Sequence, residues 1–279
     1  MRKPDWLKVP LPNSREFIEM RGLLDRLHLH SVCQEARCPN MGECFQSGTA
    51  TFLILGNTCT RNCRYCNVRH GQPDAPDQGE PERLAAAVKA LGLRYIVITS
   101  VTRDDLPDGG ASLFARCVEL LQKEISDCRV EVLIPDLEGN WKALERILAS
   151  GPHVLNHNVE VVPRFFWKLR PQGNYALSLE LLQRAGTGDR KAVTKSGFMI
   201  GFGETRDEIL SLLDDLAAVS CASLTIGQYL QPSVGHWPVA KYYEPQDFEG
   251  FRQEALQRGF KHVVSGPLVR SSYHAAKHA

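Results

Sequence analysis

The sequence lacks a long apolar run and an excess of charge of either sign. No stretch approaches eighteen consecutive apolar residues, so we expect no membrane-spanning helix and no membrane partner. The 33 Lys and Arg residues are balanced by 32 Asp and Glu residues, for a formal net charge of +1, which argues against nucleic acid as a partner. Residues 1–5 (MRKPD) contain no apolar core of a secretory leader.

Cysteine, by contrast, is plentiful, with nine in 279 residues. Without a leader we expect a reducing, cytoplasmic location, where clustered thiols serve more often as metal ligands than as disulfides. Six of the nine form two triplets. The remaining three, Cys117, Cys128 and Cys221, stand alone, and we expect them to be small buried core residues.

The triplet Cys59, Cys63 and Cys66 has the spacing CxxxCxxC and follows the apolar run at residues 51–55. Three soft ligands on one short loop can hold a [4Fe-4S] cluster by three irons and leave the fourth iron open to a substrate or cofactor. Zinc and disulfide bonding are the alternatives. Both fit poorly, because the third cysteine serves neither a pairwise bridge nor a closed four-ligand site.

A second triplet, Cys33, Cys38 and Cys44, has the spacing C-x4-C-x5-C and surrounds a stretch rich in Pro, Asn and Gly at residues 39–42. Such a loop has little apolar surface with which to order itself, so an inorganic cluster would explain its order. Three thiols again fall one short of a closed site. We therefore expect a fourth ligand from another part of the chain.

From residue 51 onward, apolar strand patterns alternate with amphipathic helix patterns. The six expected strands lie near residues 51–55, 95–99, 129–134, 153–159, 193–200 and 224–230. This alternation indicates right-handed βαβ units and an α/β fold, a partial (βα)6 parallel barrel with reactive groups at the C-terminal strand ends.

We expect three parts along the chain. Residues 1–50 form an N-terminal extension that carries the second cysteine triplet, with a proline-containing extended arm (residues 3–12) before a helix through residues 17–27. Residues 51–260 form the barrel. Residues 261–279 form a short C-terminal segment that begins with one more apolar piece at residues 262–264.

With CxxxCxxC after a first strand and a glycine-rich end of the fifth strand, the chain resembles the radical S-adenosylmethionine superfamily. The upstream C-x4-C-x5-C spacing and Arg-Ser-Ser-Tyr at residues 270–273 make it similar to the lipoyl synthase family. The resemblance covers nearly the whole chain and shows no departure at the ligand positions. Further stretches that carry it are residues 3–7 (KPDWL), 99–110 (TSVTRDDLPDGG), 156–160 (NHNVE), 194–205 (TKSGFMIGFGET) and 225–230 (TIGQYL).

The resemblance implies two [4Fe-4S] clusters. The first, on the CxxxCxxC cysteines, binds S-adenosylmethionine and cleaves it to a 5′-deoxyadenosyl radical. The second is an auxiliary cluster on the upstream triplet, consumed as the sulfur source, with a serine of residues 270–273 as its fourth ligand. We favour Ser272 over Ser271, although spacing does not separate neighbours. The catalytic residues implied are thus Cys59, Cys63, Cys66 and Ser272.

The substrate implied by the resemblance is an octanoyl chain amide-linked to a lysine of a lipoyl carrier domain, either a 2-oxoacid dehydrogenase E2 or the glycine cleavage H protein. Sulfur is inserted at C6 and C8, and an electron donor such as ferredoxin or flavodoxin is required. The rival enzymes are sulfur-inserting radical enzymes of the biotin synthase or methylthiotransferase kind. A non-catalytic iron-sulfur electron carrier is the rival from another class, and it would not need six βα units.

Residues implied to contact S-adenosylmethionine lie at the strand ends and in the cysteine loop: Tyr65, Thr99, Ser100, Asn156, Glu160, Lys195, Gly201 and Gly203. The alternatives are a plain core tyrosine for Tyr65 and a salt bridge within the strand-end layer for Glu160 and Lys195. Residues 103–105 fit a solvated loop cluster equally well. No histidine has metal-ligand spacing, and we predict only a polar contact near the site for His157.

Overall fold

One sheet of eight strands organises the described part of the chain, which in this computed structural model comprises residues 2–9, 14–36, 38–46, 51–187, 192–273 and 275–277. The sheet order is β1-β2-β5-β6-β7-β8-β9-β10, and all neighbours pair in parallel except β1 with β2. The strands are β1 (His30–Ser31), β2 (Thr51–Ile54), β5 (Tyr95–Ser100), β6 (Arg129–Leu133), β7 (Val154–Asn156), β8 (Val193–Ile200), β9 (Ser223–Gln228) and β10 (His262–Gly266).

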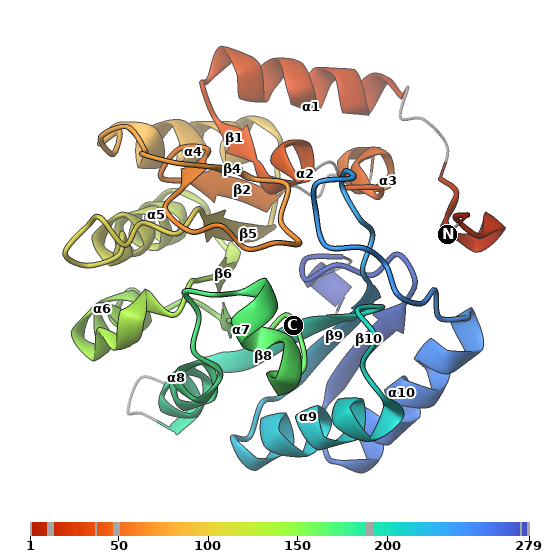
Figure 1. The fold of residues 1–279 in the computed structure, drawn as a ribbon. Helices are drawn as coiled ribbons and strands as arrows, with labels where there is room; N and C mark the ends of the chain where they lie inside the picture. Colours follow the sequence, from red (N-terminus) through yellow and green to blue (C-terminus); the bar gives the residue numbers. More distant parts are fainter. Residues whose placement is uncertain are drawn as a thin grey trace.

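Helices cover the outside of the sheet, as Figure 1 shows. The βα units contribute α4 (Glu80–Ala90), α5 (Ala111–Glu124), α6 (Trp141–Ala149), α7 (Pro163–Leu169), α8 (Tyr175–Thr187), α9 (Arg206–Ala218) and α10 (Pro245–Gln257). The N-terminal region adds η1 (Asp5–Leu7), α1 (Arg15–Arg26), α2 (Val32–Glu35) and α3 (Met41–Gln46). The short elements β3 (Thr58–Cys59), β4 (Arg69–His70), η2 (Leu137–Gly139) and η3 (Ala275–Lys277) complete the set. Among the described residues, no helix combines the length and apolar character needed to cross a bilayer.

The apolar side chains of the strands and helices form two large buried clusters. One joins α1, α4, α5 and α6 to β2, β5 and β6, and the other joins α7, α9 and α10 to β8 and β9. Cys117, Cys128 and Cys221 are buried within these clusters, which confirms the prediction that they are core residues. The core is therefore closed on the helix side, and this leaves the opposite face of the sheet to polar chemistry.

All six predicted strands and the helix over residues 17–27 are confirmed. The final apolar piece at residues 262–264 becomes β10, a further parallel strand, and the polar stretch after Asn156 leaves β7 earlier than expected. Three short helices, α2, α3 and α7, were not predicted. The prediction of an extended arm over residues 3–12 is wrong at residues 5–7, which form the 3-10 helix η1 directly after Pro4, while Pro10 to Pro12 lie outside the described residues. The three-part division at residues 50 and 260 stays a prediction, although β1 and β10 show that the sheet extends beyond it.

The C-terminal segment crosses the sheet after β10. It turns at residues 266–269 and again at 270–273, where backbone N–H groups of Val269 and Tyr273 donate to the carbonyls of Gly266 and Arg270. η3 then contacts β5, and Ala275 is fully buried. The segment thus runs from the edge strand β10 back across the sheet toward β5. This course brings residues 270–273 onto the open face of the sheet.

Candidate active site

The CxxxCxxC loop begins where the small β3–β4 pair ends. Cys59 is the last residue of β3 and lies opposite His70 of β4. Its sulfur accepts N–H groups from Thr102 at 3.3 Å and from Arg61 at 3.4 Å. The amide of Thr60 also donates to the carbonyl of Thr102 at 3.0 Å, so the loop is anchored to the segment that follows β5. The two N–H donors thus fix the position of the Cys59 sulfur.

Arg61 fixes the first half of the loop through two carboxylates. Its guanidinium donates to both oxygens of Asp104, at 2.7 and 2.9 Å, and to both oxygens of Asp136, at 2.7 Å each. The side chains of Arg61 and Asp136 are only 5% and 2% exposed. Burial alone would raise the pKa of Asp136, but its hydrogen bonds to Arg61 hold that pKa below the usual carboxyl range. Bidentate hydrogen bonds between an arginine and carboxylates fix the geometry of the loop as well as stabilising it.

The second half of the loop is held between α7 and residues 231–237. The amide of Arg64 donates to the carbonyl of Leu169 at 2.9 Å, and the carbonyl of Arg64 accepts from the amide of Trp237 at 3.0 Å. Nε2 of His236 lies 3.0 Å from the carbonyl of Cys66. Burial raises the pKa of the Cys63 and Cys66 thiols, that of Cys66 to about 12. The thiols are therefore shielded from water, and their deprotonation would be driven by a metal.

A cavity of about 430 Å³ reaches both cysteine triplets. Cys66 and Tyr65 line it from the CxxxCxxC loop, and Cys33 and Cys38 line it from the N-terminal region. Its apolar lining includes Val32, Leu133, Phe198, Met199 and Val269. The polar lining includes Asn158, Glu160, Arg270, Ser271 and Ser272. The two predicted ligand sets therefore open onto one space.

The upstream triplet is ordered by backbone and hydroxyl bonds. Cys33 lies in α2, whose N-cap Ser31 accepts its amide at 3.2 Å, and the amide of Cys38 donates to the Cys33 carbonyl at 2.9 Å. A hydrogen bond from the Cys33 thiol lowers the pKa of Cys38 to about 6, and the charge of Arg270 acts in the same direction. Burial raises the pKa of Cys44 to about 12. The same hydrogen bond, followed by burial, raises the pKa of Cys33.

The two serines of the C-terminal segment are bonded to different residues. Ser271 Oγ accepts from Asn158 Nδ2 at 2.5 Å, whereas Ser272 Oγ accepts from Thr51 Oγ1 at 2.7 Å. The segment is further tied to the upstream triplet, because Asn40 Nδ2 donates to the carbonyl of Leu268 at 2.6 Å. The hydroxyl of Tyr273 is also hydrogen-bonded to the carboxylate of Glu43, which precedes Cys44.

Asn158 links this segment to a charged pair at the end of β7. Its Nδ2 also donates to Glu160 Oε1 at 3.1 Å, while its buried Oδ1 has no partner in the described structure. Burial raises the pKa of Glu160, and the nearby Arg170 opposes that rise. Arg170 donates to the carbonyls of Asn158 and Val159, and its buried Nε also lacks a partner. Unpaired buried polar atoms are costly, so a polar ligand at this point would supply the hydrogen bonds that Asn158 Oδ1 and Arg170 Nε lack.

The residues predicted to contact S-adenosylmethionine divide into two groups. Tyr65 and Glu160 line the cavity, and the other six lie outside its lining. Thr99 donates to the carbonyl of Leu133, but Ser100 Oγ and Asn156 Oδ1 are buried without a partner in the described structure. The cofactor contacts of these residues stay predictions, and the two orphaned oxygens are where a ligand would satisfy an unmet hydrogen bond.

Lys195 has a protein partner that the sequence did not indicate. Its ammonium lies 2.9 and 3.1 Å from the two oxygens of Glu131 on β6, and not at Glu160. Asn156 Nδ2 and the Tyr95 hydroxyl donate to the same carboxylate, at 2.9 and 2.7 Å. The salt bridge predicted as the alternative for Lys195 is present, although with a different acid. Glu131 on β6 thus accepts hydrogen bonds from side chains of three other strands, β5, β7 and β8.

The glycines at the end of β8 serve local packing. Gly201 has φ of +123°, and a Cβ there would lie 2.2 Å from Gln228 Nε2 and 2.9 Å from the carbonyl of Lys241. Gly203 also has a positive φ, of +103°. The carboxylate of Glu204 accepts the amides of Gly201 and Phe202. The observed close approach at Gly201 is to protein, and a contact with adenine stays a prediction.

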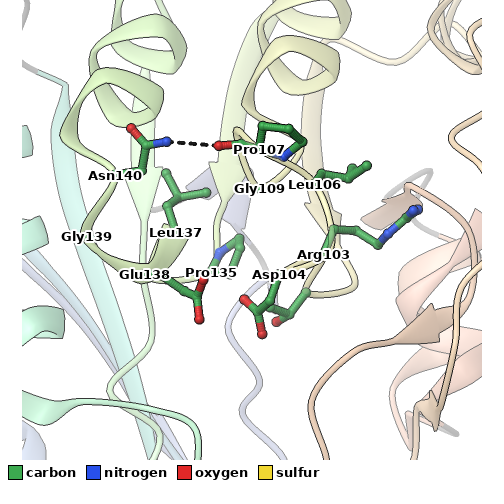
Figure 2. Close-up of a pocket in the computed structure, with 11 residues that line it drawn as sticks. Arg103, Asp104, Leu106, Pro107, Gly109, Pro135, Leu137, Glu138, Gly139 and Asn140 are labelled. Carbon is green, nitrogen blue, oxygen red and sulfur yellow. Dashed lines mark hydrogen bonds between the residues drawn. The ribbon is translucent and has the colours of Figure 1, made fainter.

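A second, polar cavity of about 270 Å³ lies at the ends of β5 and β6. Figure 2 shows Asp104 and Glu138 on one side of it and the bond from Asn140 Nδ2 to the carbonyl of Pro107 across it, 3.1 Å long. Arg103 is almost fully buried and pairs with Asp105. Residues 103–105 are therefore partly structural and not simply a solvated cluster, because Asp104 belongs to the Arg61 network.

The donor set fits iron-sulfur clusters better than a single ion. Among the described residues, no group of His, Cys, Asp or Glu side chains converges tightly enough to hold one metal ion. Each cysteine of a four-iron cluster binds a different iron, so such ligands stand apart around a larger body. All nine cysteines are free thiols. His157 is buried between the carbonyl of Ile134 and Ser178, and burial lowers its pKa to about 4, so it is a neutral structural residue.

Several residues of the site were missed by the sequence reasoning. Arg61 sits inside the CxxxCxxC motif, where its charge could have signalled a buried partner. Asn158 lies between Asn156 and Glu160, which were predicted. Nothing in the sequence around Arg170 or Thr51 indicates a role in the site. The bonds of Arg61 to Asp104, of Asn158 to Ser271 and of Thr51 to Ser272 join positions 43, 113 and 221 residues apart, which periodicity does not report.

The amino-acid sequence is similar to those of known proteins. Residues 53–216 match the Radical SAM superfamily. The lipoyl synthase of Roseiflexus sp. (strain RS-1) is 54% identical over 277 residues, which cover 99% of this chain and 92% of that protein. The lipoyl synthase of Colwellia psychrerythraea is 51% identical over 281 residues, covering 100% of this chain and 86% of that protein.

Solved structures support the same fold at low sequence identity. Streptococcus suis SuiB bound to S-adenosylmethionine has a TM-score of 0.60 and 13% identity, covering 90% of this chain and 60% of that one. Methylornithine synthase has a TM-score of 0.55 and 13% identity, covering 88% and 81%.

Proposed function

The chain belongs to the lipoyl synthase family of the radical S-adenosylmethionine superfamily, and on that premise we propose that it inserts sulfur at C6 and C8 of an octanoyl chain borne by a carrier-protein lysine. The family is enzymatic and uses a [4Fe-4S] cluster with S-adenosylmethionine. The observation that supports the finer reaction is the shared cavity, because one space is lined by residues of both cysteine triplets and by both C-terminal serines.

Cys59, Cys63 and Cys66 would hold the cluster that S-adenosylmethionine joins. When bound, that pair supplies a 5′-deoxyadenosyl radical, which can remove hydrogen from an unactivated C–H bond that no general base deprotonates. The protein's part is to hold the loop rigid and dry. Arg61 anchors one end of the loop, the amide of Thr102 faces the Cys59 sulfur, and burial shields Cys66.

Cys33, Cys38 and Cys44 would hold an auxiliary cluster as the sulfur donor. Ser272 is the better candidate for its fourth ligand, because Ser271 is already drawn toward Asn158 on the side of the first cluster. Thr51 donates its hydroxyl hydrogen to Ser272, and such a donor would lower the charge on a serine alkoxide bound to iron. A hydroxyl is a hard, weak partner for iron, which suits a cluster that is consumed.

The cavity also suits the octanoyl chain. Its apolar lining contacts methylene groups favourably, while Glu160 and Arg270 can remain with the polar cofactor. The substrate is delivered on a lipoyl carrier protein; we propose that an E2 domain or an H protein serves here, with ferredoxin or flavodoxin as the electron donor. We also propose a reducing, cytoplasmic setting, since free cysteines that bind iron need one.

Anaerobic reconstitution tests the proposal. We expect about eight irons per chain, and turnover of an octanoyl-lysine peptide to the lipoyl product. A content of about four irons per chain would refute the auxiliary cluster. Cleavage of S-adenosylmethionine without sulfur transfer would refute the assignment as a lipoyl-forming enzyme.

Two serine variants test the ligand assignment. Ser272→Ala should leave S-adenosylmethionine cleavage largely intact and impair sulfur insertion, whereas the matched Ser271→Ala should keep the auxiliary cluster. Unchanged sulfur insertion in Ser272→Ala would show that the ligand is assigned wrongly.

A further inference from the structure

An exposed aromatic residue stands beside the CxxxCxxC loop. Trp167 is 70% exposed, although it belongs to α7, the helix whose Leu169 carbonyl anchors the amide of Arg64. The ammonium of Lys168 lies over the Trp167 ring, 5.1 Å from its centroid. Arg64, which follows Cys63 directly, is also exposed. We call Arg64, Trp167 and Lys168 the Trp167 patch.

The patch carries positive charge without local compensation. In the part of the chain that the structure describes, neither Arg64 nor Lys168 forms an ion pair, whereas Arg61, Arg103 and Arg164 nearby are each paired with a carboxylate. A lysine over an exposed tryptophan ring, with a second cation, Arg64, bonded through its backbone to the end of the same helix, is the pattern of a surface that receives an acidic partner.

The patch lies outside the substrate cavity. None of its three residues lines that cavity, whose lining includes Lys3, Ala36, Gln231 and Pro232. A carrier protein must thread its acyl chain into the cavity and therefore has to dock at the cavity's opening. A partner that delivers only an electron needs only a short path to the cluster, and the backbone bond at Arg64 puts the patch one residue from Cys63.

We propose that the Trp167 patch docks a small, acidic one-electron carrier protein that reduces the cluster held by Cys59, Cys63 and Cys66. This inference rests on the proposed function, since it requires that cluster. In the step, the carrier loses one electron and the cluster gains it, with no bond formed or broken. Encounters of this kind are small and weak, so charge around a single aromatic anchor determines both their rate and their salt dependence.

Binding is measured with the reconstituted enzyme and oxidised flavodoxin, an acidic carrier, so that the readout does not depend on turnover. Calorimetry at low and high salt gives Kd for the parent, Trp167→Ala and Lys168→Glu. The matched controls are Ile18→Ala, at a residue 64% exposed on α1, and Lys123→Glu, on the exposed face of α5. Turnover is then compared with reduced flavodoxin and with dithionite as the reductant.

We expect each patch variant to weaken flavodoxin binding about tenfold, with a shallower salt dependence for Lys168→Glu and no change in either control. Turnover should fall with flavodoxin and not with dithionite. Equal Kd values for parent and patch variants would overturn the proposal, and so would a raised KM for the octanoylated carrier with unchanged flavodoxin binding. If the parent makes no lipoyl product even with dithionite, the proposed function fails, while the binding comparison still decides the patch.

Discussion

Removing Arg61 should destabilise the protein strongly, because Arg61→Gln leaves two carboxylates without their cation. The two acids differ in their access to water: the Asp104 side chain is 24% exposed and can be hydrated, whereas Asp136 is 2% exposed and cannot. Of the donors that the structure describes, only the amide of Glu138, 3.1 Å away, still donates to the Asp136 carboxylate. Breaking one partner of a buried pair costs about 3–5 kcal/mol, and we take the lower end, about 3 kcal/mol, because Asp104 recovers hydration.

The assay is thermal unfolding of the iron-free protein under anaerobic conditions. A loss of about 3 kcal/mol corresponds to a drop in Tm of roughly 6–12 °C for a chain of this size. The control is Arg252→Gln, which breaks a solvent-exposed ion pair with Glu249 and should leave Tm close to that of the parent. Adding Asp136→Asn to Arg61→Gln removes the stranded charge and should restore at least half of the lost Tm.

The pH dependence of the stability gives a second test of the Arg61–Asp136 ion pair. In the parent, the folded-state pKa of Asp136 is depressed, so its stabilising contribution is present above its ordinary value of 3.8 and is lost as pH falls. In Arg61→Gln that pKa is raised by burial, so the deficit should be largest at pH 8 and shrink toward pH 5. A variant whose Tm lies within about 2 °C of the parent at pH 8 would refute the reasoning.

Three smaller changes test other contacts. Thr51→Val keeps the side-chain shape but removes the donor to Ser272, and should lower the free energy of unfolding by about 1 kcal/mol. In a variant that lacks the CxxxCxxC thiols, the same change should also lower the amount of iron that the auxiliary site retains. Burial raises the pKa of Glu80 to about 7, so the folded state loses stability as pH rises from 4.5 to 7. Glu80→Gln should therefore raise the free energy of unfolding by about 1–3 kcal/mol at pH 8 and leave it unchanged at pH 5. Equal gains at both pH values would contradict this. Gly201→Ala should destabilise by about 1–3 kcal/mol in urea unfolding, since its Cβ would overlap Gln228, and an unchanged midpoint would show that this loop can shift.

The sheet could be predicted because its strands are apolar runs with clear ends. Residues 95–99 lie between a helix pattern and a polar loop, and they became β5 with only one residue added. The elements that were missed are short. β1 has two residues and α2 has four, and both depend on Ser31, which pairs with Phe52 and caps the helix through its hydroxyl. Such elements are stabilised by contacts made after folding, not by their own periodicity.

The site was less predictable than the fold, and Lys195 shows why. Its position on the predicted fifth strand suggested a cofactor contact or a salt bridge. Its partner, Glu131, lies on β6 within an alternating strand pattern that gives no sign of a special role. A period of two tells which face a residue occupies and not which neighbour it meets. Ser271 and Ser272 are likewise identical in sequence terms, and only Asn158 and Thr51, from distant elements, distinguish them.

The C-terminal segment connects the two halves of the site mechanically. Ser271 is bonded to Asn158, which is bonded to Glu160 beside the first cysteine loop, while Ser272 is bonded to Thr51 at the start of β2. Because the serines are adjacent, their shared peptide unit cannot move toward one set of partners without leaving the other. Loss of a ligand at Ser272 would therefore be transmitted to Asn158 and Glu160. If the proposed auxiliary cluster binds at Ser272, its consumption would also change the hydrogen bonds of Ser271 and Asn158, which border the first cysteine loop.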